Sequence, residues 1–102
     1  MKLSCLLEYD KRGYLLVPAE LARTYFPHDV LVALPKQHEV WLLPLRGSAA
    51  GGLLLKQRNQ AGDRSVLLWE QLPAGTPAGV WPAFWDESNG ALRIAFGKRT
   101  HA

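Results

Sequence analysis

The sequence has a single cysteine, and none of its apolar runs approaches the length that spans a membrane. One cysteine, Cys5, excludes a disulfide within the chain and cannot by itself form a thiolate metal site. Its alternation with Leu3 and Leu7 favours a buried, inert thiol. The first apolar stretch is broken by Glu8 and is too short for a secretory signal, so we expect a cytoplasmic protein.

Residue patterns that indicate catalysis or metal binding are also missing. No glycine-rich phosphate loop follows a strand pattern, and no serine stands in a nucleophile elbow. The His-acid neighbours His28-Asp29 and His38-Glu39 both fall in turn-like segments, where capping and solvation explain them better than metal ligation does. We therefore expect no enzyme activity, no metal and no cofactor.

The chain does contain enough apolar sequence for one small core. Its 102 residues are 48% hydrophobic and 21% charged, which is typical of a globular domain and not of a disordered segment. The formal net charge is +3, which is mildly basic. Such a charge falls well short of the dense positive surface that would by itself indicate a nucleic-acid-binding protein.

The stretch from Tyr9 to Glu20 predicts a turn, a strand and a helix start in succession. Asp10 can accept hydrogen bonds from nearby backbone N–H groups, and Gly13 can adopt a positive φ, as a reversal between two strands requires. A period of two before this turn predicts one strand, and the apolar run at 14–17 predicts the next. The segment therefore begins with a β-hairpin.

A short helix follows this hairpin. Pro18 suits the first turn of a helix, and the helix is expected to end near Tyr25, because Phe26 precedes a proline. Two more strands are predicted at 30–34 and 40–43. Residues 47–52 are all small and non-periodic, so they read as a flexible linker.

The same order of elements recurs after the linker. A hairpin is predicted from 53–58 and 64–69, followed by one helical turn near Leu72 and a second hairpin from 80–86 and 91–96. At an offset of about 50, Leu21 aligns with Leu72 and Val30 with Val80. We predict two pseudo-repeat halves, 2–46 and 53–97, in one domain, 1–102. Their strands should interleave in one sheet, because neither half has enough apolar residues to close a core.

The first half resembles the swapped-hairpin barrel of AbrB-like and MraZ-like regulators. The resemblance covers roughly Leu3 to Leu45 and rests on Asp-x-x-Gly at 10–13, alternating apolar residues, and Pro-x-x-Leu at 18–21. It implies a mainly β fold with short helices, in which two hairpin-containing halves interlock as a small β-barrel. Tyr14 stands where family members usually have an arginine.

The family resemblance also implies a function. It suggests a non-catalytic DNA-binding transcriptional regulator that binds double-stranded DNA as a homodimer on a two-fold operator. Lys11 and Arg12 would contact phosphates from the hairpin tip, and Arg23 would contact them from the adjoining helix. Tyr14, in place of the family arginine, would narrow the set of contacts that read the DNA bases. The competing interpretation of these cations is an ordinary solvated surface.

Four tryptophans support a second hypothesis. Trp81 and Trp85 share one face of a predicted strand, and an aromatic face left uncovered would suit a protein-binding accessory, assembly or maturation factor. The alternative is that these large rings simply fill the interior of a small barrel.

Overall fold

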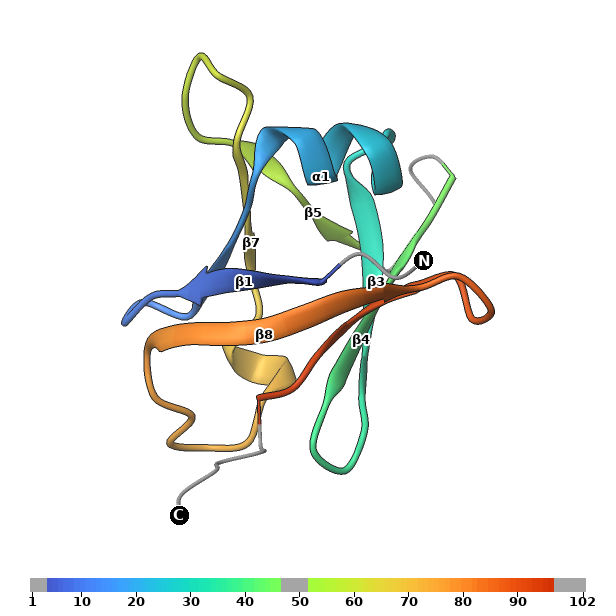
Figure 1. The fold of residues 1–102 in the computed structure, drawn as a ribbon. Helices are drawn as coiled ribbons and strands as arrows, with labels where there is room; N and C mark the ends of the chain where they lie inside the picture. The colour runs from blue at the N-terminus through green and yellow to red at the C-terminus, as the bar shows by residue number, and fades with distance from the viewer. Residues whose placement is uncertain (1–3, 47–51, 97–102) are drawn as a thin grey trace.

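The computed structural model describes residues 4–46 and 52–96, which form one antiparallel, barrel-like sheet of nine strands (Figure 1). The strands are β1 (Ser4–Tyr9), β2 (Tyr14–Val17), β3 (Val30–Pro35), β4 (Val40–Pro44), β5 (Leu53–Leu54), β6 (Lys56–Gln57), β7 (Arg64–Leu67), β8 (Gly79–Asp86) and β9 (Ala91–Ile94). The helix α1 (Ala19–Tyr25) follows β2, and the 3₁₀ turn η1 (Trp69–Gln71) follows β7. The expected mainly β fold with short helices is confirmed.

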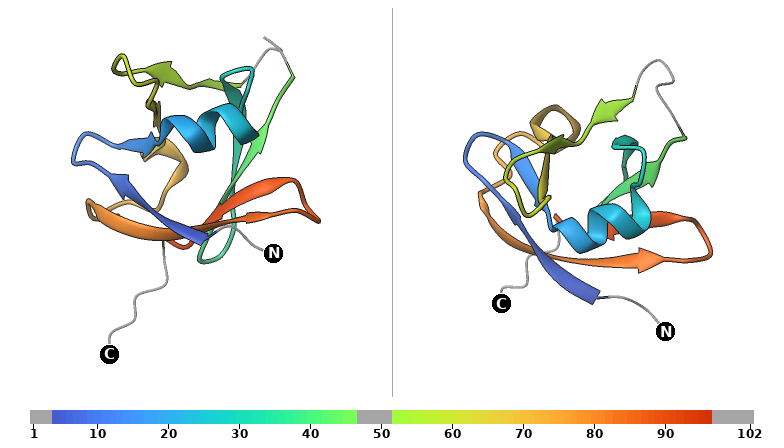
Figure 2. Two further views of the ribbon diagram at one scale, coloured as in Figure 1. Left: turned by 45° about the horizontal axis from the view of Figure 1, so that its top comes forward. Right: turned by 90° about the horizontal axis from the view of Figure 1, so that it is seen from above.

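The strand order is β5-β3-β4-β9-β8-β1-β2-β7-β6. Only Leu55 separates β5 from β6 in the sequence, so one extended segment pairs with β3 at one end and with β7 at the other. That segment nearly closes the sheet on itself, and Figure 2 shows α1 lying across one opening of the barrel. Closure of this kind removes most exposed strand edges.

Hairpins from the two halves alternate around the barrel. The β1–β2 hairpin lies between β8 and β7, and the β3–β4 hairpin lies between β9 and β5. Each hairpin of the first half is therefore flanked by strands of the second half. This is the swapped-hairpin arrangement expected from the sequence.

Alternation along the strands divides the barrel into a buried inner side and an outer side. In β1, Leu7 and Tyr9 are buried while Leu6 and Glu8 are exposed. Strands of both halves and α1 contribute side chains to one core. Its largest fully buried side chains are Phe26, Leu7, Leu15, Leu31, Leu42, Leu68, Leu92 and Ile94. No polar or charged side chain of the described residues is buried in this core.

Each half also stabilises the helical turn of the other half. The Asp63 carboxylate accepts a hydrogen bond of 2.8 Å from the Ala19 N–H at the start of α1. The first half makes a corresponding contact with the second half: the Leu68 N–H, just before η1, donates a hydrogen bond of 2.8 Å to the Gly13 carbonyl. The hairpin tips therefore cap helical turns that belong to the opposite half.

Some sequence predictions of detail are corrected. The strand expected at 53–58 is interrupted at Leu55, whose N–H donates to the Asp29 carbonyl and whose side chain is only 4% exposed. Pro18 occupies the N-cap position and not the first helical residue. Val30 is buried whereas its aligned residue Val80 is 59% exposed, so the repeat does not hold at that pair.

The linker predicted at 47–52 lies outside the described residues except for Gly52. Within the part of the chain that is described, no helix is both long and apolar enough to cross a membrane.

Candidate functional site

The tip of the β1–β2 hairpin is a tightly organised turn. One Asp10 carboxylate oxygen accepts hydrogen bonds from the Arg12 and Tyr14 N–H groups, at 2.9 and 3.0 Å, and Gly13 has a φ of 92°. These hydrogen bonds help to hold the pKa of Asp10 below its usual value, although burial opposes them. The hydrogen bonds to Asp10 and the positive φ of Gly13 were both expected from the sequence.

The cations at this tip are not equally free. Lys11 and Arg12 are exposed, but Arg12 makes an ion pair of 3.4 Å with Asp10 and lies over the Tyr14 ring, 5.1 Å from its centroid. Within the described ranges, no carboxylate lies within ion-pairing distance of Lys11. The tip therefore offers one unpaired cation and one that is partly neutralised.

The structure does not place Arg23 beside this tip. The tip precedes β2 and α1 follows it, so Lys11 and Arg23 lie at opposite ends of that strand (Figure 1). The hairpin tip next to α1 is that of the second half, where Gly62 approaches Ala19. Lys11 and Arg23 therefore do not form one cluster, because swapped hairpins place each tip against the other half's helical turn.

Charge in the described part of the chain is balanced. All nine acidic residues fall within the described ranges, whereas three of the twelve Lys and Arg residues, Lys2, Lys98 and Arg99, fall outside them. The formal excess of +3 therefore belongs to the undescribed terminal residues. The barrel itself carries no net positive charge that would attract phosphates over a distance.

Trp81 and Trp85 share a strand face, as expected, but that face is directed inward. Trp81 is only 9% exposed and packs against Phe96, with ring centroids 5.4 Å apart. Trp85 is half-buried and stacks on Tyr25 at 4.1 Å. The hypothesis that these rings form a partner surface is corrected, because the small barrel uses them to fill its interior and to seat α1.

A different surface carries most of the exposed large apolar side chains of the described residues. Leu6, Val80, Leu54 and Leu67 are 67%, 59%, 58% and 40% exposed. They lie on the outer side of β1, β8, β5 and β7, together with the exposed Pro82 and the half-buried Leu16. We call these six residues the outer apolar face.

Strand register shows how these residues lie relative to one another. Leu6 is paired with Pro82 across β1 and β8, and Val80 is paired with Glu8. The pairing of Tyr9 with Leu15 brings Leu16 beside Glu8 on the next strand. Across β2 and β7, Tyr14 is paired with Leu67. Leu54 is paired with Val30 of β3, and its strand β5 also contacts β7.

Trp69 extends this surface at the hairpin tip. Its side chain is 56% exposed, and its Cβ lies against Gly13, so that a Cβ on Gly13 would be only 2.5 Å away. Large aromatic rings held on a rigid element are typical anchors of protein interfaces. Sequence reasoning missed Trp69, whose only signal was its place at the end of a predicted strand.

A second organised surface lies on the outer side of β4, β9 and β8. Trp41, Arg93 and Phe84 are paired in one row across these strands. The Arg93 guanidinium lies between the two rings, 4.7 Å from the Trp41 centroid and 4.9 Å from the Phe84 centroid. This arrangement is a cation stacked between two aromatic rings.

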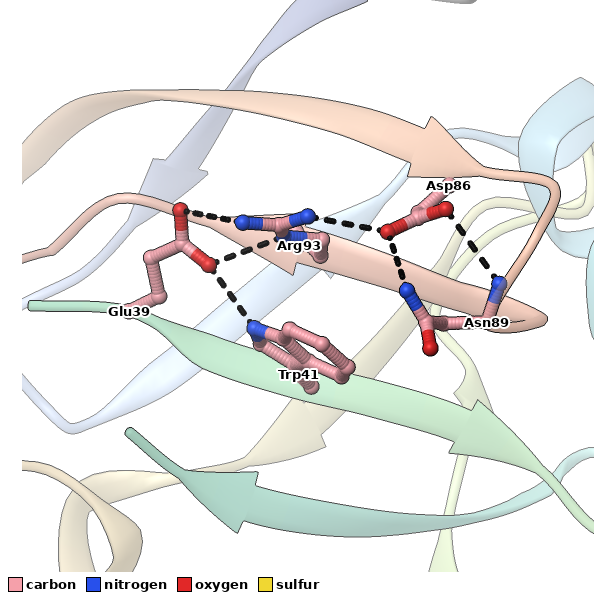
Figure 3. A network of polar contacts seen from close by, with 5 residues as sticks. All are labelled: Glu39, Trp41, Asp86, Asn89 and Arg93. Carbon is pink, nitrogen blue, oxygen red and sulfur yellow. Dashed lines mark hydrogen bonds and ion pairs between the residues drawn. The ribbon is translucent and has the colours of Figure 1, made fainter. Parts of the chain in front are cut away.

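Two carboxylates hold this guanidinium (Figure 3). Arg93 donates to both oxygens of Glu39, at 2.9 and 3.2 Å, and to Asp86 at 2.9 Å. Trp41 donates to Glu39 at 2.7 Å, and the Asn89 side chain donates to Asp86 at 2.8 Å. Every nitrogen of the guanidinium is engaged, so the network joins strands and is not an open anion site.

The same contacts lower the pKa values of both acids. The hydrogen bonds from Arg93 and Trp41 lower the pKa of Glu39, while burial opposes them. Hydrogen bonds from Asn89 and Arg93 lower the pKa of Asp86 to about 2. Both groups are therefore ionised at neutral pH and are unsuited to act as general acids. Within residues 4–46 and 52–96, no three or more His, Cys, Asp or Glu side chains are grouped so as to hold a metal ion.

A scan against protein-family models, a search of curated proteins and a search of solved structures each find no match to this chain.

Proposed function

We propose that this protein is a non-catalytic binding module that engages a protein partner through the outer apolar face. The observation that carries the proposal is the exposure of Leu6 and Val80 on the adjacent strands β1 and β8, with Leu67 on β7 and Leu54 on β5 also exposed in the same sheet. Single exposed apolar side chains are ordinary, but a contiguous group of large ones is typical of interaction surfaces. Trp69 at the edge adds an aromatic anchor.

The charges of this region favour a protein over a nucleic acid. Glu8 is exposed within the outer apolar face, beside Val80, and would repel phosphates. Lys56 lies at one margin, and Lys11 belongs to the same hairpin tip as Gly13, against which Trp69 packs. Exposed apolar side chains interspersed with charges of both signs are found in protein interfaces, whereas a phosphate-binding surface is mainly cationic.

The test is a matched pair of surface variants. Leu6→Ser with Val80→Ser should abolish cross-linking and co-purification of a partner from the native cell, because each side chain contributes about 1–2 kcal/mol when buried. Leu34→Ser is the control, since Leu34 is 39% exposed but lies on β3, outside this face. A partner lost equally with both variants, or kept with both, would contradict the proposal.

A second copy of the chain is the first alternative occupant of this face. Sedimentation equilibrium of the purified protein at micromolar concentration decides whether it is a homodimer. If it is, Leu6→Ser with Val80→Ser should give a monomer while Leu34→Ser remains dimeric. A dimer that survives the double variant would show that self-association uses another surface.

We retain duplex DNA as a second candidate because of one specific observation. Lys11 and Arg12 are exposed at a projecting hairpin tip of a swapped-hairpin barrel, the part of the fold for which the family resemblance implies phosphate contacts (Figure 1). The Asp10–Arg12 ion pair weakens this argument.

Fluorescence anisotropy against duplex DNA at several salt concentrations tests the DNA proposal. Lys11→Ala with Arg12→Ala should weaken binding evenly across sequences and reduce the salt slope by about one to two units. Arg23→Ala should lower the slope less, because Arg23 lies at the far end of β2. No binding by the intact protein at low salt would remove DNA from consideration.

A further inference from the structure

Among the differences between the two halves of the barrel, one lies at the end of an inner-side row. At an offset of about 50, the inner-side residues Leu31 and Ala33 of β3 correspond to Trp81 and Ala83 of β8, and all four are buried. The next position along is Pro35 in β3 and Trp85 in β8. The pseudo-repeat therefore places a proline where the other half has an indole ring.

In one half this indole occupies the space between the helix and the neighbouring hairpin. Trp85 stacks on Tyr25 of α1, with ring centroids 4.1 Å apart and 22° between planes, and meets Phe26 edge-on at 6.4 Å. Trp85 belongs to the β8–β9 hairpin. A single large ring thus fills the junction between α1 and that hairpin.

In the other half the equivalent junction is hollow. A cavity of about 270 Å³ lies there, between η1 and the tip of the β3–β4 hairpin. It is separate from a cavity of about 360 Å³ on the outer surface of the sheet. The apolar lining of the smaller cavity comes from Pro35, Val40, Leu72 and Phe96, of which the last three are at most 8% exposed. No aromatic residue occurs in the segment from Leu72 to Val80 to replace Tyr25.

We propose that this hollow accepts one large aromatic side chain from the protein partner. The inference rests on the proposed protein-binding function and names an anchor point for that partner. The chain itself shows what fills the equivalent space, since Trp85 does so in the other half. The volume is below the range typical of sites for whole metabolites, which suits a single side chain.

The polar rim of the hollow suits an indole or a phenol. The exposed Glu70 and the half-buried Gln71 both line it, and their side-chain oxygens can accept a hydrogen bond from an N–H or O–H group. Buried Trp and Tyr rings in interfaces usually satisfy that polar atom. The floor below the rim remains apolar and would cover the ring faces.

The hollow also adjoins the outer apolar face. The 3₁₀ turn η1 begins with the exposed Trp69, which rests on Gly13, and its later residues line the hollow. A partner segment that crosses the outer apolar face toward Trp69 would therefore reach the hollow within a few residues. The two surfaces would act as one interface with a deep anchor at its end.

The experiment titrates N-acetyl-L-tryptophanamide into the ¹⁵N-labelled full chain and follows amide resonances by NMR. We expect saturable shifts, with a millimolar dissociation constant, confined to Val40, Gln71, Leu72 and Phe96. N-acetyl-L-alaninamide is the matched control and should cause no such shifts. Shifts that are scattered, or equal for both compounds, would overturn the proposal.

A variant that makes the halves alike supplies the second measurement. Pro35→Trp should fill the hollow as Trp85 fills its counterpart, and should weaken binding of the tryptophan amide at least about tenfold. If Pro35→Trp folds and still binds the tryptophan amide unchanged, the proposal is overturned. If Pro35→Trp fails to fold, the NMR titration of the unsubstituted chain decides the proposal alone. If the same amide resonances shift as the protein concentration rises, with no tryptophan amide present, a second copy of the chain occupies the hollow. That result would also overturn the proposal.

Neither measurement uses the partner. A negative result therefore removes the anchor while leaving the outer apolar face to be judged by the Leu6 and Val80 variants.

Discussion

Replacement of Gly13 by alanine should destabilise the protein more than the same change at the equivalent tip glycine. Gly13 has a φ of 92° and Gly62 a φ of 95°, so both positions impose a similar backbone strain on an L-residue. That strain costs about 1–2 kcal/mol. The two sites differ in what a new Cβ would meet, which makes Gly62→Ala a matched control.

At Gly13 the new Cβ would lie 2.5 Å from the Trp69 Cβ, so the start of η1 would have to move. At Gly62 the closest atom is the Ala19 Cβ at 3.5 Å, an ordinary contact. Displacing packed structure costs about 1–3 kcal/mol. We therefore expect Gly13→Ala to lose about 2–5 kcal/mol and Gly62→Ala about 1–2 kcal/mol.

Urea unfolding with linear extrapolation measures both losses. Because a domain of this size has roughly 5–15 kcal/mol of stability in total, the larger loss should also lower the melting temperature by roughly ten degrees or more. Adding Trp69→Gly, which removes the opposing Cβ, should make the double variant less unstable than the sum of the single changes. Equal losses at the two glycines, within about 0.5 kcal/mol, would refute the contact with Trp69 as the cause.

Three further predictions concern the connections between the halves. The pKa values of Glu39 and Asp86 are lower in the folded protein than in the unfolded chain, so the unfolded chain binds more protons at acidic pH. Their contribution to stability should be complete above about pH 5 and should fall as the pH drops toward 2. Arg93→Gln should flatten this dependence in urea titrations at stepped pH, and an unchanged profile would contradict the prediction. Asp63→Ala removes the hydrogen bond to the first turn of α1 and should lower the melting temperature, measured by circular dichroism, by a few degrees. A much larger fall in the melting temperature would indicate a different role for Asp63. A chain ending at Gly52 should unfold or dimerise, and a folded monomer in size-exclusion chromatography would contradict the interleaved sheet.

Local features of the fold could be predicted because their signals lie within a few residues. Asp10 and Gly13 indicate the turn by their own chemistry, and β2 begins and ends where the apolar run does. The end of α1 follows from Phe26 standing before a proline. Backbone geometry decides these points before tertiary structure is considered.

Long-range contacts could not be predicted in the same way. The ion pairs of Arg93 with Glu39 and of Arg64 with Asp29, the latter at 2.9 Å, join residues that are far apart in the sequence. No short pattern links such partners. The break at Leu55 has the same origin, because it depends on a hydrogen bond to Asp29.

The surface proposed from the structure as the candidate site lies on other residues than those that the sequence indicated. Alternation assigns Leu6 to one side of β1 and Leu7 to the other, yet it does not say which apolar side chain stays exposed. Trp81 and Trp85 were correctly assigned to one face, but whether that face lies inside the barrel depends on closure of the whole sheet. The outer apolar face becomes recognisable only once the register of five strands is known.

The interleaved pairing of the halves has a consequence for synthesis and folding. In β1, Leu7 pairs with Trp81, roughly 70 positions later in the chain, so the first strands lack their neighbours until most of the protein has been made. At about 5–20 residues per second on the ribosome, these strand edges wait several seconds for their partners. During that interval a neighbouring chain can supply the same second-half strands, and exchange of hairpins between two nascent chains would form a dimer from native contacts alone.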